Sequence, residues 1–422
     1  MSLQDITPFQ ISVPESSIQH LKQKLELTTI SDDQEYTDTE EAWSHGPPAE
    51  DLRRLIDYWK EGFDWRAIET NLNNQLNMFK TRIDVERFED VEVHFVHHKS
   101  ANQSENAIPL LFIHGCELAF LEQSSKLLTP KSSGPGSFLE VSKLLGDLTS
   151  VSAGANSEYP TFNIVAPSLP NFGFSSVTTK RGFGLDQYAE VCHKLMLQLG
   201  YEQYVTQSGD LGFRIARTIG IRYPTSCKAS HINMLRASPP TLLSQPVTWL
   251  RYMLTPYSAR DKKGFERSKW FVEQGSGTEH PSRLEIKTVD TQELHDWSDD
   301  YTWTEDEILT WVSLYWHSTA GPTAAQRIYY EMVNSLGTTI NDTEKYVPHV
   351  KLGLAHFPKE LIVVPTLWCR TLGEVVYEKE HPRGGHFAAY EKPADIVNDL
   401  RIMFGRGGGA FAIVDGRDGY AN

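Results

Sequence analysis

The 422-residue sequence predicts an α/β fold in which helices cover a doubly wound, mostly parallel sheet. Two short apolar runs, IPLLFIHG (108–115) and TFNIVAPSLP (161–170), have the composition of parallel strands that are buried on both faces. Residues 198–224 then read as a strand, a tight turn and a helix. Strands that alternate with helices along the chain favour a parallel sheet over an antiparallel one.

Further strands and one terminal helix follow from their periodicity. VEVHFVHH (91–98) alternates as a half-buried strand does, and further strands are expected at 349–357 and 373–380. The second of these precedes a helical pattern that runs from Pro393 to Phe404. The sheet is therefore expected to continue close to the C-terminus.

Two other regions are predicted to be mainly helical. Apolar spacing predicts short amphipathic helices at 17–27 and 50–63, within a polar, Trp-containing N-terminal region. Residues 236–347 are mostly helical and rich in Trp and Tyr, and they lie between two predicted strands, which is the usual position of a cap over a site. The Gly-rich stretch 404–411 lacks the GK[ST] of a phosphate loop and is expected to be a turn.

Composition excludes several classes of function. The chain carries 40 basic and 55 acidic side chains, a net charge of −15, so it would gain no counterion-release energy from nucleic acid and would be repelled by anionic membranes. Its cysteines are too few and too scattered for a disulfide scaffold or structural zinc: Cys116, Cys192, Cys227 and Cys369. Without a leader or an anchor pattern, we expect a cytoplasmic protein with no cofactor and no metal.

The strongest local signal for chemistry is Ser208-Gly209-Asp210-Leu211-Gly212, between the predicted strand and helix. Small residues on both sides suit a strained turn that presents Asp210 as a nucleophile, at a helix N-terminus that favours negative charge. A carboxylate in that position can attack carbon and form an ester. Alone, the same pattern would also suit an Asp that caps the helix.

Two further residues complete a catalytic order. His386 lies in a Gly-Gly-His turn after the last strand, and Glu360 follows the strand before it. Each would be unremarkable alone, but Asp210, Glu360 and His386 occur in the hydrolase order of nucleophile, acid and base. Each follows a predicted strand, at the edge where α/β sheets carry their sites.

The sequence resembles the microsomal-type and fungal epoxide hydrolases of the α/β-hydrolase superfamily. The resemblance covers nearly the whole chain. It rests on these segments: ITPFQISVPESSIQHLKQKL (6–25), YWKEGFDWRAIETNLN (58–73), FKTRIDVERFEDVEVHFVHHKS (79–100), APSLPNFGFSS (166–176), QSGDLG (207–212), WTEDEILTW (303–311), STAGPTAAQRIYYE (318–331) and RGGHFAAYEKP (383–393).

This resemblance implies an α/β-hydrolase fold with a helical cap and an N-terminal extension. It implies an enzyme that opens an epoxide to a vicinal diol through an aspartyl ester, with Asp210 as nucleophile, His386 as base and Glu360 as the acid that orients His386. Tyr329 matches the cap tyrosine that donates a proton to the epoxide oxygen, with Tyr330 as the alternative register. The implied partners are a small apolar or aryl epoxide and water, and a homodimer is left open.

The chemistry also needs two N–H donors for the oxyanion of the ester-hydrolysis step. One is the main chain of Leu211, and the other should come from the loop after 108–115.

The four expected parts of the chain are an N-terminal region (1–90), a first core part (91–235), a cap (236–347) and a second core part (348–422).

The sequence departs from the family in two places. Residues 116–134, nineteen in all, stand where the family has one residue, in the loop expected to supply the second oxyanion donor. In the cap, residues 278–293 are about half as long as the family stretch, and Thr278 stands where a first cap tyrosine is expected. We therefore expect reduced activity. The alternatives are an inactive ligand-binding protein of the same fold and a hydrolase like the haloalkane dehalogenases.

Overall fold

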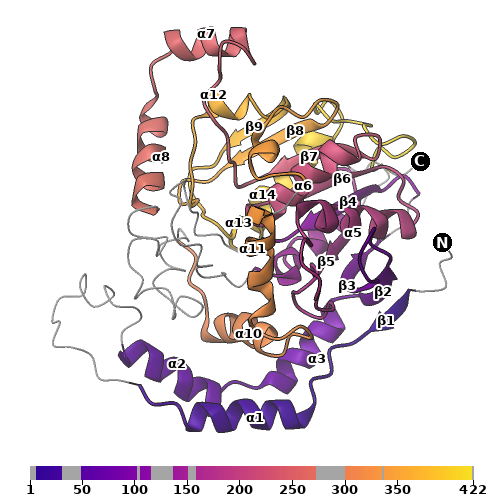
Figure 1. Ribbon diagram of the computed structural model, residues 1–422, viewed down its shortest axis with the longest axis vertical. Helices are drawn as coiled ribbons and strands as arrows, with labels where there is room; N and C mark the ends of the chain where they lie inside the picture. Colours follow the sequence, from indigo (N-terminus) through magenta and orange to yellow (C-terminus); the bar gives the residue numbers. More distant parts are fainter. Residues whose placement is uncertain are drawn as a thin grey trace.

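The computed structural model describes residues 6–30, 49–101, 105–115, 136–150, 158–271, 300–334 and 337–420. A twisted sheet runs through these ranges and carries helices on both faces (Figure 1). Its strands are β1 (Thr7–Phe9), β2 (Met78–Ile83), β3 (Val91–His98), β4 (Ile108–Ile113), β5 (Phe162–Pro167), β6 (Tyr204–Ser208), β7 (Cys227–Ile232), β8 (Lys351–His356) and β9 (Glu374–Glu380). The predicted α/β class is confirmed.

The strand order is β1-β2-β3-β5-β4-β6-β7-β8-β9. Strands β1, β2 and β3 pair antiparallel, as do β3 and β5, whereas every pairing from β5 to β9 is parallel. The direction of winding reverses at β4, which has β5 on one side and β6 on the other. Ligands of doubly wound sheets bind beyond the carboxyl ends of the strands at such a reversal. The topology therefore points to the ends of β4 and β6.

Strand β4 shows why its sequence is apolar at every position. Each of its six residues is buried. Leu110 and Phe112 belong to the apolar cluster that contains residues of α14, whereas Leu111 and Ile113 belong to the cluster that contains residues of α5 and α6. Because successive side chains point to opposite faces, a strand covered on both faces needs an apolar residue at each position.

Helices cover the two faces of the sheet, and others lie before β2 and between β7 and β8. They are α1 (Glu15–Glu26), α2 (Ala49–Glu61), α3 (Trp65–Gln75), α4 (Leu145–Thr149), α5 (Leu185–Gln198), α6 (Asp210–Arg222), α7 (Pro246–Leu254), α8 (Ala259–Trp270), α10 (Glu305–Trp316), α11 (Arg327–Asn334), α12 (Thr366–Cys369), α13 (Ala388–Glu391) and α14 (Pro393–Phe404), with the 3₁₀ turns η2 (Phe138–Val141), η6 (Ala324–Gln326) and η7 (Asn341–Glu344). In the part of the chain that the structure describes, no helix is long and apolar enough to cross a membrane.

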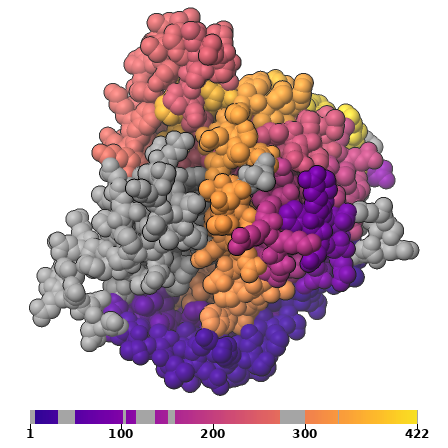
Figure 2. Space-filling view, in the orientation of Figure 1, coloured from indigo at the N-terminus to yellow at the C-terminus, as the bar shows by residue number. Residues whose placement is uncertain are grey.

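The N-terminal segment extends the sheet and supports the helices that lie between β7 and β8. Its strands β1 and β2 continue the sheet beyond β3, and α2 contacts α10. Figure 2 shows the indigo N-terminal segment against the orange segment. The Tyr58 hydroxyl donates to Asp306 at 2.8 Å, and the rings of Trp65 and His317 lie 5.0 Å apart. These contacts hold α10 against the base formed by the N-terminal helices.

Candidate active site

The turn between β6 and α6 has the strained geometry that the sequence predicts for it. Asp210 has a φ of +49°, in the left-handed region that few residues other than Gly, Asn and Asp adopt. Gly209 precedes it in an extended conformation, and Asp210 opens α6. The chain therefore reverses sharply at Asp210 and places its carboxylate at the carboxyl edge of the sheet.

The glycines on either side of Asp210 leave space for close backbone approaches. A Cβ on Gly209 would lie 2.7 Å from Nδ2 of Asn233, and one on Gly212 would lie 2.2 Å from the carbonyl oxygen of Ile113. Real Cβ atoms do not approach main-chain oxygen so closely. Gly212 thus lets α6 pack directly on the end of β4, which fixes the position of Asp210 relative to that strand.

Replacing Gly212 by alanine should therefore destabilise the protein. We expect a loss of about 1–3 kcal/mol in the free energy of unfolding, because α6 must move away from β4. Gly146 in α4 is the matched control, since a Cβ there meets nothing within 4 Å. Gly146→Ala should leave stability unchanged or raise it by up to about 1 kcal/mol. Denaturant unfolding of both variants measures the difference; equal stabilities would contradict the close approach.

His386 and Glu360 form a buried pair at the same edge of the sheet. Nδ1 of His386 lies 2.6 Å from Oε1 of Glu360, and both side chains are almost completely buried. The same carboxylate oxygen accepts the main-chain N–H of Leu361 at 2.9 Å. Because a carboxylate only accepts, the proton of a neutral His386 sits on Nδ1 and its Nε2 carries the lone pair. That is the tautomer that a water-activating base requires.

The loop that carries His386 is anchored to the core by a second buried network. Nε2 of His381 lies 2.8 Å from Oδ2 of Asp399, and the hydroxyl of Tyr377 donates to the other oxygen at 2.6 Å. The ring of His381 also stacks on Phe357 with the centroids 4.4 Å apart. This network lies outside the pocket and holds the segment between β9 and His386 in place.

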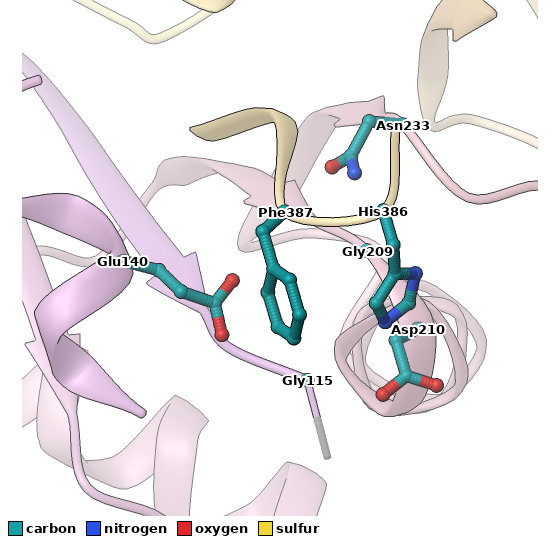
Figure 3. Close-up of a pocket in the computed structure, with 7 residues that line it drawn as sticks. All are labelled: Gly115, Glu140, Gly209, Asp210, Asn233, His386 and Phe387. Carbon is teal, nitrogen blue, oxygen red and sulfur yellow. The ribbon is translucent and has the colours of Figure 1, made fainter. Parts of the chain in front are cut away.

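The three predicted residues converge on one pocket. Asp210 and His386 line it together with Gly115, Glu140, Gly209, Asn233 and Phe387 (Figure 3). The figure shows the imidazole of His386 beside the carboxylate of Asp210. Glu360 lies behind His386 and reaches the pocket only through that ring.

Burial and local charge set the ionisation of Asp210. Burial raises the pKa of its carboxyl, whereas His386 and the main-chain N–H of Leu211 act in the opposite direction. The main chain of Leu211 therefore favours the carboxylate form of Asp210, and its role as the first oxyanion donor stays a prediction. A desolvated carboxylate is a stronger nucleophile toward carbon than a hydrated one.

The predicted tyrosine lies on a helix between β7 and β8. Tyr329 on α11 is buried, with 6% of its surface exposed, and belongs to the same apolar cluster as Leu211. Its neighbour Tyr330 is 47% exposed. Tyr329 is not among the residues that line the pocket around Asp210, so its role as proton donor stays a prediction. Because Tyr329 is buried and Tyr330 is exposed, Tyr329 is the better candidate of the two for a proton donor inside the protein.

Three of the pocket residues have no role predicted from the sequence. Asn233 directly follows β7, a strand that the sequence analysis did not identify, and Gln207 donates to its side chain at 3.1 Å. Phe387 follows His386 in the same turn. Glu140 lies in η2, and its only signal was an acidic residue in the otherwise apolar run Phe138–Val141.

The two departures from the family pattern lie outside the described residues. Residues 116–134 fall within the gap 116–135, and residues 278–293 with Thr278 fall within the gap 272–299. The flanks of the first gap are described. A Cβ on Gly136 would lie 2.2 Å from the carbonyl oxygen of Gly115, so the two flanking glycines are in contact. The end of β4 thus stays next to η2.

Replacing Glu360 by glutamine should slow the step that His386 catalyses. The amide oxygen can still accept from His386 and Leu361, so the ring keeps its orientation, but the charge that stabilises an imidazolium is lost. We expect hydrolysis of a covalent intermediate to fall by about 10–10³-fold, less than on loss of the base itself. Rapid-quench kinetics measures this; an unchanged rate would mean that Glu360 does not act through His386.

Comparison with known proteins agrees with this geometry. The family model described as epoxide hydrolase N terminus matches residues 6–123. A Stigmatella aurantiaca protein that bears the name of an epoxide hydrolase is 30% identical over 419 residues, covering 94% of this chain and 84% of that protein. Epoxide hydrolase 1 of Sus scrofa is 27% identical over 440 residues, with 95% and 89% covered. The structure of Aspergillus niger epoxide hydrolase matches with a TM-score of 0.69 at 28% identity, covering 93% of this chain and 94% of that one.

Proposed function

This chain belongs to the epoxide hydrolase family, and from that premise we propose that it opens a small apolar or aryl epoxide to a vicinal diol through an ester on Asp210. The observation that carries the proposal is the convergence of Asp210, His386 and Glu360. The first two line one buried pocket, and the third is hydrogen-bonded to the second at 2.6 Å.

In the first step an oxygen of Asp210 attacks a ring carbon and the carbon–oxygen bond of the epoxide breaks. The ring oxygen leaves as an alkoxide, which is a poor leaving group unless it receives a proton. In this proposal the phenol of Tyr329 supplies that proton. Tyr329 lies on α11, within the part of the chain that the sequence predicts to form the cap.

In the second step water hydrolyses the ester. Nε2 of His386 takes a proton from the water as its oxygen attacks the carbonyl carbon of the Asp210 ester. Glu360 holds the ring in place and stabilises the imidazolium. The N–H of Leu211 stabilises the tetrahedral oxyanion, which collapses to release the diol and restore the carboxylate.

Turnover of styrene oxide by the purified protein tests the proposal. Diol formation above the uncatalysed rate is the expected result. A protein that releases no diol from styrene oxide or other aryl and alkyl epoxides, although it is folded, would contradict the proposal and favour an inactive ligand-binding protein.

Tyr329→Phe should slow formation of the ester and leave its hydrolysis unchanged. A well-placed general acid contributes about 10²–10⁴ in rate, so we expect at least about a 10²-fold fall in the alkylation rate. Tyr330→Phe is the matched control and should retain the alkylation rate, because Tyr330 is largely exposed. If the two variants behave the other way round, Tyr330 is the proton donor.

A further inference from the structure

The pocket contains a second buried carboxyl group that the reaction scheme above does not use. Glu140 lies in η2 with 9% of its surface exposed and lines the pocket together with Asp210 and His386. Its neighbours in the chain, Phe138 and Val141, are buried apolar residues. A carboxyl group is costly to bury in such surroundings unless it has a partner.

One oxygen of Glu140 lacks a partner. Oε1 is fully buried and has no hydrogen bond within the described residues. It lies 3.0 Å from the position that a Cβ on Gly136 would take, at the point where Gly136 meets Gly115. Figure 3 shows the carboxyl group pointing toward Phe387, whose ring lies between it and the side chains of His386 and Asp210 in this view. An acceptor is therefore presented to the pocket.

We propose that Glu140 is a positioning residue for the hydrolytic water: its Oε1 accepts one O–H of the water whose other proton passes to Nε2 of His386. This inference rests on the proposed ester mechanism. The water oxygen attacks the carbonyl carbon of the Asp210 ester, the ester C–O bond breaks, and the departing alkoxide takes the proton back from His386. The second proton of the water stays on the new Asp210 carboxyl and leaves through solvent as the carboxylate forms, while Tyr329, which gave up a proton in the first step, takes one up. Glu140 neither gains nor loses a proton during the step.

The charges in the pocket favour the carboxylate form of Glu140 once the ester on Asp210 has formed. The pKa of Glu140 is raised to about 8, chiefly by burial and also by the charge of Asp210, while His386 acts in the opposite direction. The main chains of Ser137 and Gly115 favour the carboxylate. Alkylation makes Asp210 neutral and removes its repulsion. The carboxylate of Glu140 is thus favoured in the intermediate, when the water has to be held.

Rates of ester formation and ester hydrolysis in single turnovers of styrene oxide test the proposal. Glu140→Ala should slow hydrolysis by about 10²-fold, the usual cost of a misplaced reactant, and leave alkylation within about 3-fold. Glu140→Gln keeps an acceptor oxygen and should recover most of the hydrolysis rate. Glu190→Gln, which alters a buried carboxyl of α5 outside the pocket, is the matched control and should change neither rate.

Three results in Glu140→Ala would overturn the proposed role of Glu140. An unchanged rate of ester hydrolysis in Glu140→Ala would mean that Glu140 does not position the water. Equal decreases in the rates of ester formation and ester hydrolysis would show a purely structural effect. Slower alkylation alone would make Glu140 a proton donor to the epoxide. If Glu140→Ala does not fold, Glu140→Gln decides: alkylation slowed more than hydrolysis contradicts the proposal. Absence of any ester in the unmodified protein would instead refute the proposed function.

Discussion

Asp210→Asn will lower epoxide turnover by at least about 10⁴-fold, because the amide cannot attack the ring carbon. Removal of a catalytic nucleophile elsewhere costs up to about 10⁶ in kcat. Asparagine is the suitable replacement here, since it matches the shape of aspartate and tolerates the φ of +49° at this turn. Diol formation from styrene oxide measures the loss.

The control for this variant is Asp186→Asn, which changes an acidic residue in the first turn of the neighbouring helix α5. It should retain the turnover of the unmodified protein. Burial raises the pKa of Asp210, which means that its negative charge destabilises the folded state. Asp210→Asn removes this charge and therefore should not lower the melting temperature. A variant that is folded and still turns over at the normal rate would remove Asp210 from the mechanism.

His386→Gln should block ester hydrolysis and leave ester formation nearly intact. Without Nε2 as a base, water attacks the ester about 10²–10⁴-fold more slowly, so the intermediate accumulates on Asp210. Mass spectrometry of the quenched protein should show a full equivalent of alkylated Asp210 after mixing with epoxide, where the unmodified protein shows a transient fraction.

His193→Gln serves as the control for loss of a buried histidine. His193 lies on α5 and bonds the hydroxyl of Tyr204 at 2.9 Å, away from the pocket. It should show no accumulation of ester. If His386→Gln also abolishes alkylation, His386 does more than activate water, and the division of labour between the two steps is wrong.

Much of the sheet could be predicted because burial on both faces leaves a strong signal. The expected strands at 91–98, 108–115 and 349–357 are present as β3, β4 and β8, and the expected helix Pro393–Phe404 matches α14. Strand β7 was missed because its sequence, CKASHI, has few apolar residues. Its burial comes from its neighbours β6 and β8, which a local pattern cannot reveal.

Part of the site could be predicted from the sequence as well. Asp210, Glu360 and His386 each follow a strand, and the parallel sheet brings the ends of such strands to one edge. Glu140 and Asn233 could not be found in this way. Glu140 reaches the pocket through the contact between Gly115 and Gly136, and Asn233 follows the strand that was missed. Both depend on packing between segments distant in sequence.

Single-turnover hydrolysis of an epoxide in heavy-oxygen water, with protein in excess, tests the covalent mechanism most directly. If Asp210 forms the ester, its own oxygen enters the diol. The diol of the first turnover should therefore contain light oxygen only, and the peptide that contains Asp210 should carry the heavy atom. Heavy oxygen in the diol of the first turnover, with an unlabelled Asp210, would mean that water attacks the epoxide directly and would contradict the account.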